Sequence, residues 1–369
     1  MSTPFRYAHA AGEDWREIVE TCLPQLAGPP ATLGFVYLTD VLAPFADDIT
    51  ALLRERTGVQ HWVGSIGIGI CATGREYLDE PALAVMLADF APGSFQVFSG
   101  IRTVDDLKMR KLGCGERAAN FAIVHADPAN SSVPELIAGI AGKMESGFVV
   151  GGLSSSRGEN LQIAEKTHDG GVSGVVLSDD ITVATRLSQG CSPVGPVHSI
   201  TDAQRNIVLK LDGRPALDVL KEDVGEKLAR DMPRLGATVF AGLPVAGTDT
   251  GDYLVRNLVG IDAARGLVAI GDEAEEGGEL MFCRRDNASA VEDLRGMLDS
   301  IKEGLYTKPR GALYFSCLGR GANLFGPESE ELKIIQAGLG DLPLVGFFGN
   351  GEISHNRLYG YTGVLTLFA

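Results

Sequence analysis

The stretch Leu344-Val-Gly-Phe-Phe-Gly-Asn-Gly-Glu352 decides the fold, because it is one of three apolar runs in this chain that break up into glycines. The other two are Trp62-Val-Gly-Ser-Ile-Gly-Ile-Gly-Ile70 and Gly147-Phe-Val-Val-Gly-Gly-Leu-Ser154. Nearly continuous apolar runs are typical of strands that are covered on both faces, or on one face plus a domain contact. We therefore expect three buried strands that end in glycine-rich turns.

Each of these strands is preceded by another apolar run and a helical pattern. The spacing from Phe35 to Val63 equals the spacing from Phe121 to Val149, which favours duplication over chance. Interior strands that open the three units are predicted at residues 33–38, 121–124 and 312–316, each followed by a helix packed on the sheet. Further apolar runs close the units at residues 82–87, 174–177 and 361–368.

The pattern predicts an α/β (α+β) fold of layered mixed β-sheets with packed helices, built from duplicated strand–helix–strand–strand units. Turn residues crowd the segments 188–196 and 211–216, which places a domain boundary near residue 215. Beyond it, a helix is expected over residues 217–228, and another begins after a cap at Asp286. We expect an N-terminal extension at 1–30, one module at 31–215 and a second module at 216–369.

Composition narrows the class of protein. Of the 369 residues, 45% are hydrophobic and 22% are charged, which is typical of a globular chain. The net charge of −16 disfavours nucleic acid as a general partner, because it repels phosphate backbones. The sequence has no apolar stretch of about 18 residues, so membrane insertion is not expected. Six single cysteines without a C-x-x-C pattern indicate reduced thiols and a cytoplasmic protein.

Several spaced motifs carry a family resemblance. The segments 310–321, 342–352 and 361–365 resemble the closing half of the FIST family, and the segments 188–196, 211–216 and 253–261 resemble the stretches that link its two modules. The resemblance covers roughly residues 31–369. It implies a bacterial sensor in intracellular signal transduction that binds small ligands such as amino acids. It also implies a signalling partner such as a histidine kinase or a cyclic-dinucleotide enzyme.

The candidate binding site combines two glycine-rich loops, at residues 316–323 and 349–355. If the preceding runs are neighbouring strands, both loops leave the same edge of the sheet, where α/β folds commonly bind ligands. Arg320 offers a planar fork for a carboxylate and Glu352 suits an amine, so the two would suit a free amino acid in one shared cleft. The alternative is that they form a salt bridge that only closes a loop. The predicted ligand-binding residues are Arg320, Glu352, Ser316, Cys317, Asn323, Asn350, Gly349, Gly351, Arg256 and Ser154.

Two other classes of function stay open. Some FIST proteins bind haem and sense nitric oxide, and His355 is the histidine we would test as a haem ligand. The weaker alternative is an enzyme that acts on a small amino compound. No nucleophile elbow, zinc-hydrolase motif or Walker pattern occurs in the sequence, so we predict a binding protein without catalytic residues or a required cofactor.

Overall fold

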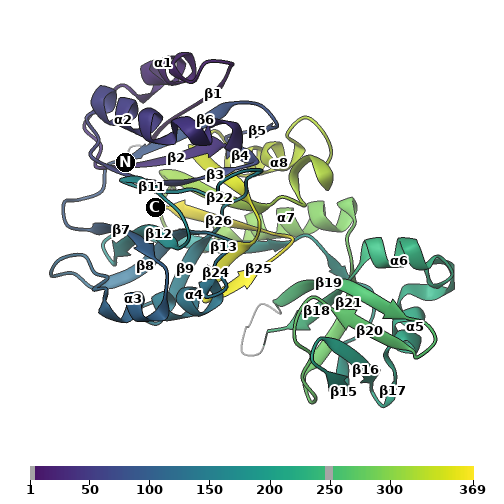
Figure 1. The fold of residues 1–369 in the computed structure, drawn as a ribbon. Helices are drawn as coiled ribbons and strands as arrows, with labels where there is room; N and C mark the ends of the chain where they lie inside the picture. Colours follow the sequence, from purple (N-terminus) through teal and green to yellow (C-terminus); the bar gives the residue numbers. More distant parts are fainter. Residues whose placement is uncertain (1–4, 246–251) are drawn as a thin grey trace. The chain divides into compact units, whose positions relative to one another are not determined.

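The computed structural model describes residues 5–245 and 252–369, and it divides into two compact units (Figure 1). The first unit comprises Met1–Ser188 and Asp293–Ala369. The second unit, Gln189–Glu292, is inserted between these two parts of the sequence. The boundary expected near residue 215 falls within the second unit, between β17 (Arg214–Pro215) and α5 (Ala216–Ala229).

The first unit contains three copies of the predicted strand–helix–strand–strand repeat. In each repeat the first strand pairs in parallel with the second, across a crossover helix, and pairs antiparallel with the third. The first repeat consists of β2 (Leu33–Thr39), α2 (Ala46–Thr57), β3 (His61–Gly67) and β6 (Ala82–Ala88). The second consists of β8 (Ala119–Ala126), α4 (Val133–Ala141), β9 (Phe148–Leu153) and β12 (Val172–Ser178). The third consists of β22 (Gly311–Cys317), α8 (Glu330–Leu339), β23 (Leu344–Gly349) and β26 (Thr362–Phe368). The predicted strands, the helix after each and the fold class are confirmed.

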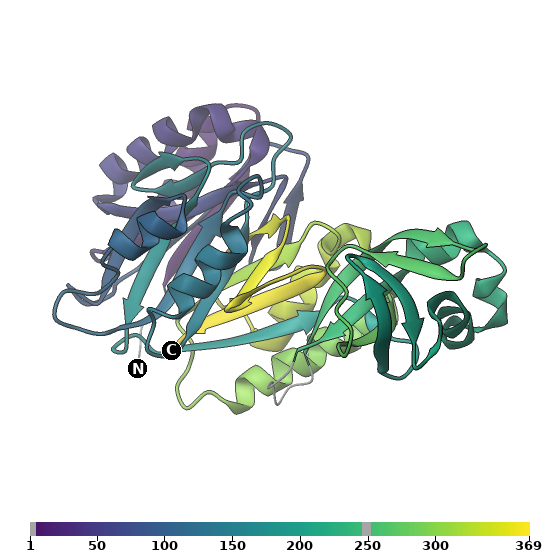
Figure 2. The ribbon, with the colours of Figure 1, turned by 60° about the horizontal axis from the view of Figure 1, so that its bottom comes forward.

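Each repeat also includes a strand and a helix that precede these four elements in the chain. The strands β1 (Arg6–Ala11), β7 (Phe95–Ile101) and β13 (Val183–Gln189) pair with the third strands of their repeats, and Figure 2 shows β13 alongside β26. The helices α1 (Trp15–Leu26), α3 (Val104–Met109) and α7 (Asn287–Glu303) then lead towards the first strands. Residues 6–26, which the sequence placed in an extension, thus belong to the first repeat. Asp286 caps α7 as predicted, because its carboxylate accepts the Ser289 N–H.

A β-hairpin follows the second strand of each repeat and joins the sheet of another repeat. The hairpin β4–β5 (Gly69–Ala72, Arg75–Leu78) of the first repeat pairs with β23 of the third. The hairpin β10–β11 (Gln162–Ala164, Lys166–His168) of the second pairs with β3 of the first. The hairpin β24–β25 (Glu352–His355, Arg357–Tyr359) of the third pairs with β9 of the second. This cyclic exchange gives three sheets with the same strand order.

Glycine is required at one equivalent position in the second strand of every repeat. Gly64, Gly151 and Gly346 lie opposite residues of the first strands in the parallel pairs. A Cβ atom there would lie 1.6, 1.8 and 1.7 Å, respectively, from the carbonyl oxygen of that partner residue. The glycines that break the apolar runs in the sequence therefore allow two strands to approach closely.

Each first-strand residue that lies opposite one of these glycines is followed by a ring-bearing residue. These three residues, Tyr37, His125 and Phe315, meet in the core shared by the three sheets. Their rings lie 5.6 to 6.2 Å apart, and the Tyr37 hydroxyl is 3.1 Å from His125 Nε2. Burial lowers the pKa of His125 to about 3, so this imidazole is neutral. The three repeats therefore pack around one aromatic centre.

The second unit is an antiparallel sheet in which β21 (Glu279–Arg284) pairs with both β15 (His198–Gln204) and β18 (Val239–Pro244), so the strand order closes on itself. The ring continues through β16 (Ile207–Leu211), β20 (Leu267–Ile270) and β19 (Tyr253–Asp262), with the short β14 (Ser192–Pro193) and β17 added to it. Apolar side chains of α5 and α6 (Met232–Thr238) share a core with these strands.

Candidate functional site

Arg320 lies in the turn between β22 and the short 3-10 helix η2 (Gly321–Asn323), and its side chain is buried. Its Nε donates to Glu331 Oε1 at 2.7 Å, and its terminal nitrogens donate to the carbonyl and hydroxyl of Ser188. Burial lowers the pKa of the guanidinium, but Glu331 and Tyr314 together raise it above its usual value. Arg320 is therefore a charged side chain whose partners are all inside the protein.

Glu331 is the centre of this cluster. It stands in the first turn of α8, and its carboxylate also accepts the Tyr314 hydroxyl at 2.6 Å, the Gly321 N–H at 2.7 Å and the Ser316 hydroxyl. Glu331 was not among the residues predicted from the sequence. The available signal was a glutamate within the apolar face of a predicted helix, a position where a buried charge requires a partner.

Glu352 is fully buried on β24 and has partners of its own. Its Oε2 accepts the N–H and the hydroxyl of Thr362 at 3.1 and 2.8 Å. Burial raises the pKa of Glu352 to about 8. Burial and the neighbouring Glu352 also raise the pKa of the Cys317 thiol to about 12, so Cys317 is a neutral thiol and a poor nucleophile.

The structure pairs Arg320 with Glu331 rather than with Glu352. Arg320 and Glu352 are close enough for the guanidinium to lower the pKa of that carboxyl, although burial outweighs this effect. Neither side chain lines the cavity beside α5, α6 and the end of β21 or the cavity between α7 and α8. The geometry resembles the loop-closing alternative more than a shared open cleft.

The other predicted residues lie in three places: just after β9 and at the end of β23, in η2, and in the second unit. Ser154 contacts the Ser65 hydroxyl at 2.8 Å, and its carbonyl accepts the side-chain amide of Asn350. The carbonyls of Gly349 and Gly351 accept backbone N–H groups of neighbouring loops. Asn323 donates to the Leu318 carbonyl at the surface. Arg256 belongs to the second unit, where it pairs with Asp272 at 2.7 Å.

His355 does not fit a haem site. It is half-buried on the β24–β25 turn, its Nδ1 lies 3.0 Å from Asn356, and its ring packs edge-on against Phe148 at 4.6 Å. An axial haem ligand needs an apolar pocket beside it. No histidine lines the cavity beside α5, α6 and β21 or the cavity between α7 and α8. In the described part of the chain, no group of three or more metal-binding side chains is placed to hold an ion.

The second unit contains a cavity of about 620 Å³ with a charged wall, here called the basic pocket. Its lining comes from the end of α5, from α6 and its entry, and from the end of β21 and the residues after it. Four cationic side chains face it against two carboxylates, over an apolar floor. The lining residues are Val224, Lys227, Leu228, Asp231, Arg234, Thr238, Arg284, Arg285 and Asp286.

The two carboxylates of the basic pocket differ in their partners. Asp286 accepts both the N–H and the hydroxyl of Ser289, and the Ser289 N–H holds the pKa of Asp286 below its usual value. Asp231 accepts the Arg234 N–H through Oδ1 only. Among residues 5–245 and 252–369, neither Lys227 nor Arg234 forms a side-chain ion pair. The pocket thus keeps the charges of Lys227 and Arg234 uncompensated, whereas Arg284 pairs with Asp286 at 3.8 Å.

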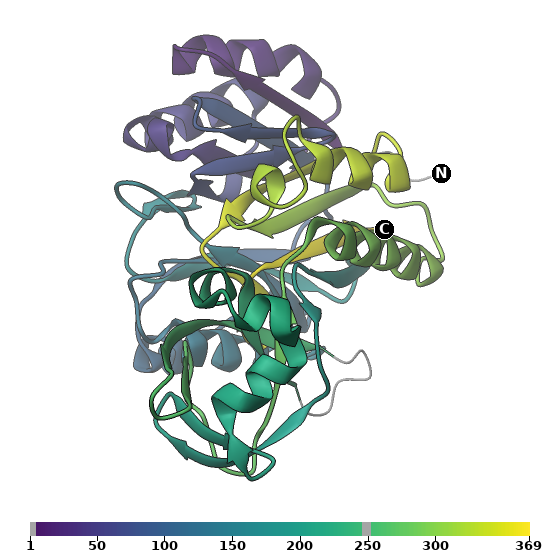
Figure 3. The same ribbon diagram turned by 90° about the vertical axis from the view of Figure 1, so that its right-hand side faces the viewer.

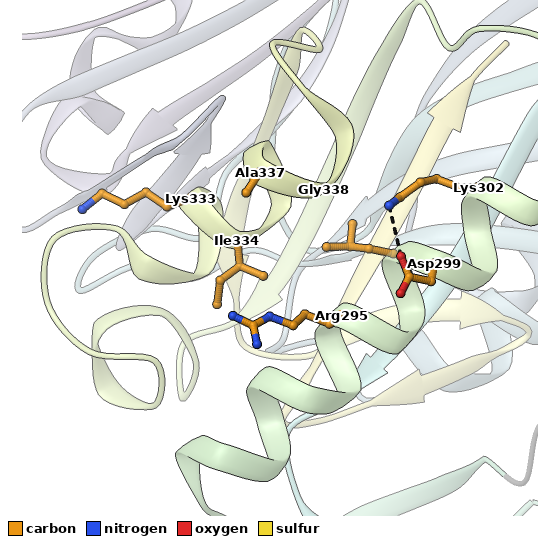
Figure 4. Close-up of a pocket in the computed structure, with 8 residues that line it drawn as sticks. Arg295, Asp299, Lys302, Lys333, Ile334, Ala337 and Gly338 are labelled. Carbon is orange, nitrogen blue, oxygen red and sulfur yellow. Dashed lines mark hydrogen bonds and ion pairs between the residues drawn. The ribbon is translucent and has the colours of Figure 1, made fainter.

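A second cavity, of about 410 Å³, lies between α7 and α8 in the first unit and is here called the α7–α8 groove (Figure 4). Charged side chains surround an apolar floor. The lining residues are Arg295, Leu298, Asp299, Lys302, Lys333, Ile334, Ala337 and Gly338.

Comparison with known proteins identifies the family. The FIST N domain model matches residues 32–214, and the FIST C domain model matches residues 216–355. The chain belongs to the FIST family. It is similar to an uncharacterized protein of Mycobacterium tuberculosis, with 31% identity over 359 residues that cover 93% of each chain. It is also similar to an uncharacterized protein of Mycobacterium bovis, with 31% identity over 363 residues that cover 93% of this chain and 92% of the relative.

FIST domains are associated with sensory signal transduction. Within this FIST protein, the basic pocket and the cluster around Glu331 both lie in the segment matched by the FIST C domain. The FIST C segment also supplies β24 to the sheet of the second repeat, which lies in the FIST N segment. No helix in the described residues has the length and apolar character needed to cross a membrane.

Proposed function

We propose that this FIST protein is a sensor in signal transduction that binds a small carboxylate-containing metabolite, such as an amino acid, in the basic pocket. The observation that carries the proposal is the gathering of four cationic side chains on one cavity of a chain whose net charge is −16. Such a local excess of positive charge attracts anions and raises their rate of encounter.

The lining suits a small metabolite in three respects. Arg234 and Arg284 carry planar guanidinium groups, which bind carboxylates with two parallel hydrogen bonds. Asp231 keeps Oδ2 without a hydrogen bond in the described part of the structure, and that oxygen suits an ammonium group. Val224 and Leu228 provide apolar surface for a short carbon chain. A few polar groups over an apolar floor are typical of small-molecule sites.

Two parts of the proposal concern context. No disulfide joins any of the six cysteines, all of which lie in the described residues, and this supports a reducing compartment such as the cytoplasm. The association of FIST domains with sensory pathways supports a signalling enzyme, such as a histidine kinase or a cyclic-dinucleotide enzyme, as the protein that receives the signal.

Isothermal titration of the full-length protein tests the proposal. The probes are glutamate, aspartate, leucine, glutarate, 2-oxoglutarate and inorganic phosphate. We expect binding of at least one carboxylate, and substitution Arg234→Ala or Arg284→Ala should weaken it by roughly 10- to 100-fold through loss of a charge-assisted hydrogen bond.

Arg230→Ala is the matched control. Arg230 is 80% exposed, pairs with Glu226 and does not line the basic pocket. If Arg230→Ala weakens binding as much as the pocket substitutions, the attraction is non-specific. If no probe binds with a dissociation constant below about 1 mM, the pocket is not a site for this class of ligand.

A further inference from the structure

The two helices that form the α7–α8 groove pack less closely than the corresponding helix pairs of the other repeats. In the first two repeats, α1 packs closely on α2 and α3 packs closely on α4, whereas α7 and α8 approach each other less closely in the described structure. Figures 1 and 3 show α7 and α8 as neighbours. The two helices meet where Leu298 lies against Gly338. A Cβ atom added at Gly338 would be only 3.0 Å from the Leu298 side chain. The space beside this contact is the groove.

The floor of the groove is apolar and comes from both helices. Leu298 of α7 is 2% exposed, and Ile334, Ala337 and Gly338 lie on one face of α8. Because two of these residues are small, the floor stays recessed between the helices. A recessed apolar floor of this kind receives the apolar face of an added helix, which contributes side chains at positions i, i+3, i+4 and i+7.

The rim of the groove is basic. Arg295, Asp299 and Lys302 follow one another at helical spacing along α7, and Lys333 stands on α8 (Figure 4). Figure 4 shows Arg295 extending from α7 towards Ile334 of α8. In the described residues Arg295 has no ion pair, although the chain as a whole carries a net charge of −16. Its guanidinium is available to a carboxylate from outside.

The ion pairs that the other rim cations make are exposed. Lys302 pairs with Asp299 at 3.1 Å, and Lys333 pairs with Glu330 at 3.1 Å and with Glu328 at 3.9 Å, with side chains 43% to 84% exposed. Exposed pairs of this type contribute little to stability, so a partner's carboxylates can replace them at little cost. The groove therefore combines an apolar floor with cations that can be paired from outside.

We propose that the α7–α8 groove docks an acidic amphipathic helix of a partner protein. Charge complementarity selects this occupant, because the rim carries cationic side chains on a protein whose net charge is negative. Complementary charges steer association and fix the register of a bound helix. The inference does not depend on which ligand fills the basic pocket, since the groove is formed entirely by residues of the first unit.

Fluorescence anisotropy of the full-length protein with two labelled helical peptides tests the proposal. Both peptides present leucines at positions i, i+3, i+4 and i+7; one carries glutamates on its flanks and the other carries lysines. We expect the acidic peptide to bind and the basic one to bind at least roughly tenfold more weakly. Affinity for the acidic peptide should fall when NaCl is raised from about 50 to about 500 mM, because salt screens the rim.

Two variants locate the binding. The charge-reversed pair R295E/K302E should weaken binding of the acidic peptide by roughly tenfold or more and improve binding of the basic one. Ala337→Trp should block both peptides by filling the floor. The matched control is K108E/K111E, which makes the same charge change at and just beyond α3, the corresponding helix of the second repeat; it should bind the acidic peptide as the wild type does. Hydrogen exchange should show peptide-dependent protection within residues 293–303 and 330–339.

Three results would overturn the proposal. The first is no binding of the acidic peptide up to about 1 mM. The second is equal binding to R295E/K302E and K108E/K111E, or protection elsewhere in the chain. The third is a concentration-dependent dimer, detected by sedimentation, that Ala337→Trp dissociates, because the occupant would then be a second copy of this chain.

Discussion

The side chains of Arg320 and Glu331 form an ion pair at 2.7 Å in which neither is exposed to solvent. The pair joins the turn after β22 to the first turn of α8, and it holds the Tyr314 hydroxyl and the Gly321 N–H in the same cluster. A buried pair of this kind is costly to break, because the remaining charge stays in the interior without compensation.

Substitution of one partner of this pair is expected to destabilise the first unit. Arg320→Met should lower the free energy of unfolding by about 3 to 5 kcal/mol, and R320M/E331L should recover part of that loss because it removes both charges. Urea denaturation measures the effect.

The control for this prediction is Arg230→Ala, which removes an exposed pair with Glu226 and should cost at most about 1 kcal/mol. Ligand affinity at the basic pocket should be unchanged in folded Arg320→Met. A stable Arg320→Met protein that has lost its ligand would instead support the sequence-based assignment of Arg320 to the binding site.

Glu352 is expected to make stability depend on pH. Its pKa is raised by burial from 4.5 to about 8, so the folded state holds a proton that the unfolded state releases between these values. The free energy of unfolding therefore falls as pH rises through this window. Glu352→Gln should remove this contribution and make the protein more stable than the wild type above pH 8, as measured by urea denaturation at several pH values.

A residual slope of the same sign should persist in Glu352→Gln. Burial raises the pKa of Glu76 to about 7. The pKa of His198 is also raised: burial lowers it, but hydrogen bonds to Asp212 and Asp223 raise it more. Glu328→Gln, at a side chain that is 84% exposed, is the control and should follow the wild-type profile. An unchanged slope in Glu352→Gln would contradict the assignment.

The close approach of strands at Gly346 predicts strong intolerance of a side chain. In Gly346→Ala the new Cβ would lie 1.7 Å from the Tyr314 carbonyl oxygen, so the strands must separate, at a cost of about 3 kcal/mol or more. Gly296→Ala is the matched control, because no atom lies within 4 Å of a Cβ there and alanine favours a helix by about 0.5 to 1 kcal/mol. Thermal unfolding should show opposite shifts, and equal shifts would refute the argument.

Removal of the second unit is expected to leave the first unit folded. Replacement of residues 190–285 by a short flexible linker keeps every sheet of the three repeats and keeps Asp286, which caps α7. We expect cooperative unfolding of this variant and no binding of carboxylates. A fragment of residues 1–215 lacks the strands that pair with β4 and β9 and should not fold cooperatively. Circular dichroism of a stable, monomeric 1–215 fragment would contradict this expectation.

The sequence was sufficient to predict the three repeats, because the close approach of parallel strands leaves glycine within an apolar run at each copy. It was not sufficient to predict the exchange of hairpins. Short segments such as Gln162–Ala164 have the same local pattern whichever sheet they join, and tertiary packing decides their partner. The sequence also did not predict that the second unit is inserted in the first. The turns near residue 215 are typical both of a domain boundary and of a loop within a domain.

The candidate site was only partly predictable. The sequence predicted that Arg320 and Glu352 reach one shared cleft. Their burial and their actual partners depend on Glu331 and Thr362, which other elements supply. The basic pocket draws its cations from positions between 227 and 285 without any local motif. Such a site can be found only after the fold brings these elements together.

The exchanged hairpins also govern the risk of aggregation. On one side, each of the three sheets ends in the outer strand of a hairpin contributed by another repeat, and these strands, β5, β11 and β25, are only three or four residues long. A long unpaired edge offers a template on which another chain can add a strand, whereas a very short edge does not. At this edge, the three repeats thus protect one another's sheets from association with another copy of the protein.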